Sequence, residues 1–122
     1  MNAQENGKKE VLFVGKPNHY TEGLDNAMQG RNFNLTYVSG VGEAFRSYRK
    51  QHSDVIVIPG VMTGCAPETF IGYIRRKEAL QKAEKTAHIV VLDKKEISGN
   101  TEDVRLVPNR FNYDSVVSAI GE

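Results

Sequence analysis

The chain has 122 residues, of which 39% are hydrophobic and 25% charged, and its formal net charge is +1. This composition suits one folded domain, and so small a net charge gives no field that would draw the chain to nucleic acid or to an anionic membrane. No apolar run approaches the roughly 20 residues needed to cross a bilayer. The single cysteine excludes an internal disulfide and favours a reducing, cytoplasmic compartment. We expect a flexible polar tail over residues 1–9 and one domain over 10–122.

Segments that favour strands and helices alternate along the chain. Short runs rich in β-branched residues predict strands, and apolar residues spaced at i, i+3, i+4 and i+7 predict helices. We expect strands at 11–14, 35–38, 54–59, 89–92 and 104–107, and helices at 20–30, 41–51, 67–85 and 113–120, the last with Asn112 as its N-cap.

The order of these elements predicts a doubly wound parallel sheet with helices on both faces, because right-handed crossovers join parallel strands. Only ten residues, 94–103, separate the last two strands. Parallel strands normally need a crossover of about a dozen residues or more. We therefore expect the helix of this crossover to be shortened or lost.

The strand that begins at Asp54 is apolar on four consecutive positions, which is typical of a strand covered on both faces. Its end should lie at the edge of the sheet where ligands of open parallel sheets bind. At that edge it presents Pro59. The central strand therefore contributes no polar side chain to this edge of the sheet.

Four stretches identify a related family: the run 11–14, the Asp54 strand with Gly64, the run 89–92, and the sequence 109–112 before an amphipathic helix. Together they resemble the receiver domain of two-component response regulators, over residues from about 10 to 121. The resemblance implies a flavodoxin-like five-stranded sheet of order 2-1-3-4-5.

The same resemblance implies a degenerate phosphorylation site. Receivers accept the phosphoryl group on an Asp that ends the third strand, where this chain has Pro59, a residue without a side-chain heteroatom. Gly15 and Lys16 stand in place of the acidic pair that holds Mg²⁺, and an ammonium repels a cation. Asp93 replaces the Thr or Ser that ends the fourth strand, and Asn109 replaces a Lys. We therefore expect no bound metal and no cofactor.

These losses predict a pseudo-receiver, a phosphorylation-independent protein–protein interaction module in bacterial signalling. The expected partner is a protein or a covalently linked effector domain, with a homodimer as a further option and neither nucleic acid nor membrane as a partner. The candidate partner surface consists of Leu106, Arg110, Phe111 and Tyr113.

Two other classes of function stay open. One is a small-ligand-binding domain that uses the crevice at the ends of the first and third strands, lined by Gly15, Lys16, Pro59, Gly60 and Cys65. The other is an enzyme, which we rank last because the sequence shows no nucleophile–base or acid–base pair.

Several charged residues have two interpretations. Lys16 and Asp93 could face each other as a salt bridge or a water-mediated pair that replaces metal and phosphate, or each could be solvated separately. The basic run 75–77, with Lys82 and Lys85, could meet an acidic partner. A solvated helix face is the favoured interpretation, because Glu78 and Lys82 form an i, i+4 pair. Cys65 is expected to be a free, unreactive thiol, and the three histidines match no zinc-binding spacing.

Overall fold

The computed structural model describes residues 8–50, 52–83, 85–99 and 101–121. Its five strands are parallel and lie in the order β2-β1-β3-β4-β5, which confirms the predicted doubly wound sheet. The strands are β1 (Lys9–Val14), β2 (Phe33–Val38), β3 (Val55–Pro59), β4 (His88–Leu92) and β5 (Val104–Val107). The helices are α1 (His19–Met28), α2 (Val41–Lys50), α3 (Pro67–Leu80) and α4 (Tyr113–Gly121).

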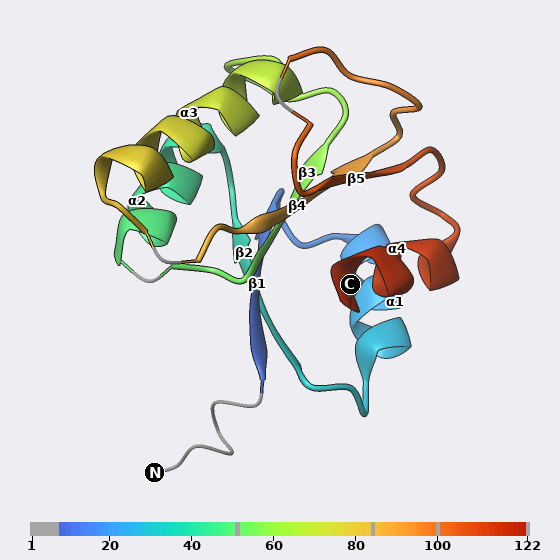
Figure 1. Ribbon diagram of the computed structural model, residues 1–122. Helices are drawn as coiled ribbons and strands as arrows, with labels where there is room; N and C mark the ends of the chain where they lie inside the picture. Colours follow the sequence, from blue (N-terminus) through green and yellow to red (C-terminus); the bar gives the residue numbers. More distant parts are fainter. Residues whose placement is uncertain (1–7, 51, 84, 100, 122) are drawn as a thin grey trace, which may run out of the picture.

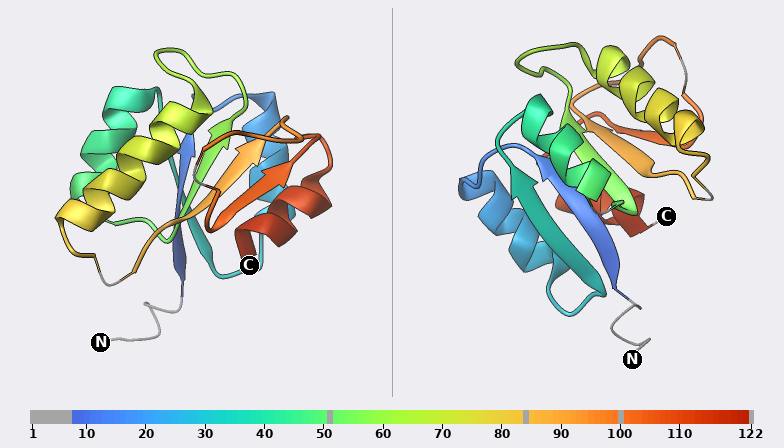
Figure 2. Two further views of the ribbon diagram at one scale, coloured as in Figure 1. Left: turned by 45° about the horizontal axis from the view of Figure 1, so that its top comes forward. Right: turned by 90° about the vertical axis from the view of Figure 1, so that its left-hand side faces the viewer.

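The helices form two layers, α1 with α4 on one face of the sheet and α2 with α3 on the other (Figures 1 and 2). The two central strands, β3 and β4, contact both layers. Residues 55–58 and 89–92 are at most 1% exposed, as continuous apolar runs predict. Each face of the sheet therefore has its own hydrophobic core.

Helix α3 ends at Leu80 rather than at residue 85, which corrects the boundary expected from the sequence. The chain leaves the helix through a left-handed residue, Lys82, with φ of 53°. Lys82 donates its N–H to Ala79 and Ala83 donates its N–H to Glu78, which is the pattern of a Schellman motif. A lysine occupies the position where glycine is usual, so the sequence gives no sign that the helix ends here.

Strand β1 begins at Lys9, inside the stretch expected to be a tail, because Lys9 pairs with Phe33 of a longer β2. The rest of the expected tail, residues 1–7, lies outside the described residues, as does Gln51 at the expected end of the second helix. At α4, the Asn112 side chain accepts from the N–H of Ser115 at 3.2 Å, which confirms the predicted N-cap.

No helix connects β4 to β5 in the described ranges 93–99 and 101–103, so the crossover helix is lost as expected (Figure 1). Helix α3 holds this loop instead. Arg75 donates to the backbone oxygens of Glu102 at 3.0 Å and Asp103 at 3.3 Å, and Ile97 packs against the core beneath α3.

Arg75 and Glu78 do not form the solvated face that the sequence suggested. Glu78 is 3% exposed and pairs with Arg75 at 3.0 Å, three residues earlier, rather than with Lys82. Its other oxygen accepts from the Tyr48 hydroxyl at 2.7 Å and from the Ala87 N–H at 2.8 Å. We call these four residues the buried cluster. The hydrogen bonds within this cluster satisfy the Glu78 carboxylate, which the charge pattern of the sequence predicted to lie in solvent.

Candidate functional site at the carboxyl end of the sheet

The parallel register brings the ends of β1, β3 and β4 to one edge. Pro59 of β3 lies beside Leu92 of β4, so Asp93 follows directly next to it. Gly15 leaves β1 and donates its N–H to Val38 at 2.7 Å, which ties the end of β1 to β2. We call this edge the mouth of the sheet.

The turn after β3 lies very close to the end of β4. A methyl group added to Gly60 would lie 2.6 Å from the Leu92 oxygen and 2.8 Å from a side-chain carbon of Lys94. Gly60 is therefore required by the approach of the two strand ends, and Pro59 before it is partly buried. Pro59 offers neither a hydrogen-bond donor nor a nucleophilic oxygen at this position.

The polar feature of the mouth is an ion pair between Asp93 and Arg110. Asp93 adopts a left-handed conformation with φ of 62°. Its two carboxylate oxygens accept from the Arg110 Nε–H at 2.5 Å and from the Arg110 backbone N–H at 3.0 Å. The Arg110 guanidinium thus neutralises the carboxylate, and the main chain of the same residue satisfies its second oxygen.

The suggested pair between Lys16 and Asp93 is not formed. Lys16 is exposed, and across the described chain no ion pair joins it to Asp93. The physical reason lies in the loop after β5. The Asn109 side chain accepts from the Phe111 N–H at 3.0 Å, and this turn directs the Arg110 N–H and guanidinium toward Asp93.

An aromatic cluster from three segments borders this ion pair. The Arg110 guanidinium lies 5.5 Å from the centre of the Tyr20 ring, a cation–π distance. Tyr20 contacts Phe111 edge-to-face at 5.8 Å and stacks on Tyr113 at 5.2 Å, and the Tyr113 hydroxyl donates to the Tyr20 backbone oxygen at 3.0 Å. Burial raises the pKa of Tyr20 to about 12, and the nearby Arg110 opposes that rise.

Sequence reasoning missed the role of Tyr20. Its position on the apolar stripe of α1 indicated only a core residue, and the core is where most of its ring lies, 8% exposed. A tyrosine in the first turn of the first helix, with an arginine and two aromatic residues after the last strand, could have suggested the contact. The sequence does not determine the angle at which the loop after β5 approaches α1.

A small crevice lies beside the mouth and encloses about 160 Å³. Two of the five residues expected to line it, Gly15 and Pro59, do so. Lys16, Gly60 and Cys65 do not belong to its lining, which is completed by residues of the loops after β2 and β3. Burial raises the pKa of the Cys65 thiol, so this cysteine is less reactive than a free one.

The residues of the expected partner surface lie in two places. Arg110, Phe111 and Tyr113 lie together in the aromatic cluster, with Phe111 69% exposed. Leu106 packs partly against the core under α2 and α3, on the opposite face of the sheet. A hollow of about 360 Å³ between the β5 edge and α4 also includes Leu106.

Within the described ranges, no three His, Cys, Asp or Glu side chains come together in a group that could hold a metal ion. None of the helices in those ranges is both long and apolar enough to span a membrane.

No model of a known protein family matches the chain, and no curated protein matches its sequence. Solved structures do match its fold. A receiver domain of a response regulator from Methylobacillus flagellatus is 15% identical, with a TM-score of 0.66 over 93% of this chain and 98% of that one. The receiver domain of a response regulator from Saccharomyces cerevisiae, solved in complex with a histidine phosphotransfer protein, is 15% identical, with a TM-score of 0.69 over 93% of this chain and 86% of that one.

The pseudo-receiver domain of the CikA protein is also similar, 9% identical with a TM-score of 0.62 over 92% of this chain and 93% of that one. At such identities the likeness concerns the fold alone. The chain therefore has the CheY-like, flavodoxin-like fold of receiver domains, and the residues that the structure describes form four helices.

Proposed function

We propose that this chain is a pseudo-receiver that works through protein–protein contact without being phosphorylated. The observation that carries the proposal is Pro59 at the end of β3, the position that receivers use for their phosphoryl acceptor. Transfer to protein needs a nucleophilic oxygen in line with the phosphorus, and proline has none. Lys16 follows the end of β1, where Mg²⁺ would need carboxylate ligands, and it brings a positive charge instead.

The ion pair at the mouth supports the same proposal. The Asp93 carboxylate would repel a phosphoryl oxygen, and both of its oxygens already accept hydrogen bonds from Arg110. In this arrangement the loop after β5 is held by a permanent charge pair instead of a transient phosphate. The domain would thus present one constant surface to its partner.

The partner surface that fits best is the part of the expected set that the fold keeps together. Phe111 is a large apolar side chain that is 69% exposed, with Arg110 and Tyr113 beside it. Exposed aromatic residues next to an arginine are typical of residues that contribute strongly to binding. The receiver domain from Saccharomyces cerevisiae was crystallised with a protein partner, and we propose a protein partner or a linked effector domain here too.

A small-ligand-binding domain is the second candidate, but the small volume of the crevice beside the mouth does not favour it. Its volume of about 160 Å³ lies below the roughly 300–1,000 Å³ of typical ligand pockets. Lys16 does not reach its lining. Metabolite screening by thermal shift would revive this candidate if one compound raised the melting temperature in proportion to its concentration over Kd.

An NMR titration with Mg²⁺ and beryllofluoride tests the absence of a phosphoryl site. We expect the amide signals of Gly15, Gly60 and Asp93 to stay unchanged, while a phosphorylatable receiver measured alongside shows large shifts. Incubation with acetyl phosphate should add no phosphoryl group by mass spectrometry. Saturable shifts around the mouth, or a phosphoryl adduct, would overturn the proposal.

Co-purification from native cells tests the partner surface. Substitution of Phe111 with Ala should remove a protein that the tagged wild-type chain retains. Val61, which is 88% exposed on the loop after β3, provides the matched control, and Val61→Ala should retain the same protein. Equal recovery with all three chains would exclude the Phe111 surface.

A further inference from the structure

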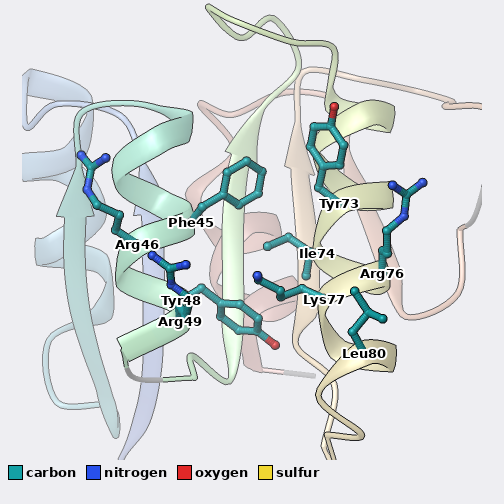
Figure 3. A pocket seen from close by; sticks show the side chains of 9 residues that line it. All are labelled: Phe45, Arg46, Tyr48, Arg49, Tyr73, Ile74, Arg76, Lys77 and Leu80. Carbon is teal, nitrogen blue, oxygen red and sulfur yellow. The ribbon is translucent and has the colours of Figure 1, made fainter.

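A second surface feature lies between α2 and α3 and shares no lining residue with the crevice beside the mouth. The two helices leave a hollow of about 300 Å³ between them (Figure 3). We call it the α2–α3 groove. It is lined by Phe45, Arg46, Tyr48, Arg49, Tyr73, Ile74, Arg76, Lys77 and Leu80.

The inside of the groove is apolar and well packed. Phe45 stacks on the buried Phe70 at 5.1 Å and meets Tyr73 edge-to-face at 5.7 Å. Ile74 is 1% exposed and supports the groove from below. On its rim, Leu80 is 73% exposed, although it is a large apolar residue. Exposed apolar residues next to an apolar hollow are typical of interaction sites.

The rim of the groove carries only positive charge. Arg46 and Arg49 of α2 and Arg76 and Lys77 of α3 belong to its lining, which contains no Asp or Glu (Figure 3). Four cationic side chains here contrast with a net charge of +1 for the whole chain. The field of the groove is therefore local and positive.

Among the residues that the structure describes, no carboxylate forms an ion pair with any of these four cations. The carboxylate near Arg46 is Glu43, which already accepts from the backbone and side chain of Ser39 at 2.7 Å.

We propose that the α2–α3 groove binds an acidic, amphipathic peptide segment of a protein partner. An apolar side chain of that segment would enter the hollow, and its carboxylates would meet the arginines on either helix. The proposal rests on the interaction role given above but concerns a face that does not include Phe111. A nucleic acid or lipid phosphate would meet the same charges and leave the apolar hollow unfilled, so a peptide with an apolar anchor fits better.

Selection of a random displayed peptide library on the folded chain tests this inference. We expect the enriched peptides to combine several Asp or Glu residues with a Leu, Phe or Met anchor. They should shift the NMR signals of Tyr73 and Leu80, and their affinity should fall as ionic strength rises. The double substitution Arg49→Glu with Arg76→Glu should weaken binding by at least about tenfold.

Two controls keep the result interpretable. Arg31→Glu with Lys95→Glu makes the same change in net charge at two exposed positions elsewhere, and it should alter the affinity less than about twofold. Leu80→Ser keeps all four cations but removes an exposed apolar side chain from the rim of the groove. It should weaken binding by about three- to tenfold, because the apolar anchor of the peptide loses part of its contact. Melting curves verify that each variant is folded.

Three outcomes would overturn the inference: no acidic enrichment, unchanged binding after the double charge reversal, or shifts that map away from the groove. Preferential binding of a single-stranded oligonucleotide or of phosphatidylserine vesicles by the same residues would also overturn it. If no peptide binds at the groove and the NMR signals do not shift on addition of beryllofluoride, only the groove proposal is wrong. Peptide binding at the groove together with beryllofluoride binding at the mouth removes only the pseudo-receiver proposal.

Discussion

Two arginine–carboxylate pairs among the described residues differ mainly in burial. Arg75 and Glu78 lie on one helix, and their side chains are 13% and 3% exposed. Arg110 and Asp93 join two loops at the mouth, and their side chains are 28% and 40% exposed. The first pair holds backbone together inside the protein, whereas the second stays in contact with solvent at the mouth.

This difference indicates what each pair can do. Water screens the Arg110–Asp93 pair, so its removal should change the surface more than the stability. The Glu78 carboxylate is desolvated, and removal of any one of its partners leaves a charge or a polar group without compensation. The four predictions below test this comparison, beginning with the change of largest expected effect.

Substitution of Glu78 with Ala should give the largest loss. It leaves the Arg75 guanidinium, the Tyr48 hydroxyl and the Ala87 N–H without their shared acceptor. We expect the free energy of unfolding to fall by about 3–5 kcal/mol in urea denaturation. Glu22→Ala, at an exposed position of α1, is the control and should change the free energy of unfolding by less than about 0.5 kcal/mol. Equal effects of the two substitutions would show that the buried cluster is dispensable.

Arg75→Lys tests whether α3 replaces the missing crossover helix. A lysine keeps the charge, but it cannot donate to Ala87, Glu102 and Glu78 at once as the guanidinium does. We expect a loss of about 2 kcal/mol, with faster hydrogen exchange at residues 102–104. Arg76→Lys, one residue along on the exposed side of α3, should have almost no effect on either measurement. Unchanged exchange in the loop would mean that Arg75 does not restrain it.

The sequence predicted the sheet well because β3 and β4 have continuous apolar runs, and these residues have no other way to be buried. It predicted the lost crossover from loop length alone, and the residues at the mouth from their positions after each strand. In each of these cases the information is local to a few consecutive residues.

What it could not predict depends on angles between distant elements. Glu78 and Lys82 satisfy the spacing of a helical surface pair, yet the helix ends before Lys82 can pair and turns Glu78 inward. Lys16 follows β1 at the correct edge, but the turn at Asn109 brings Arg110 to Asp93 instead. Charge patterns along a sequence do not distinguish between two cations that the fold brings to the same edge.

Arg110→Ala sharpens the comparison from the exposed side. It removes the ion pair with Asp93 and the cation–π contact with Tyr20, both partly exposed. We expect a loss of only about 1 kcal/mol, reduced further in 1 M salt. Lys16→Ala, the alternative partner, should change stability by less than about 0.5 kcal/mol. A loss as large as that of Glu78→Ala would mean that exposure does not separate the two pairs.

Tyr20→Phe tests the smallest effect, at the point where the core reaches the mouth. Among the described residues, no protein atom forms a hydrogen bond with the buried Tyr20 hydroxyl, so its removal should raise the free energy of unfolding by about 1 kcal/mol at neutral pH.

The same substitution should change the response to alkali. The tyrosine pKa is about 10 in the unfolded chain and about 12 in the fold. Between these values the unfolded state binds fewer protons, so stability falls as the pH rises. Tyr20→Phe should therefore reduce the slope of stability against pH between about 10 and 12. Destabilisation by Tyr20→Phe would instead show that the hydroxyl has a bound partner, and the mouth would then hold an ordered water or ion next to the Asp93–Arg110 pair.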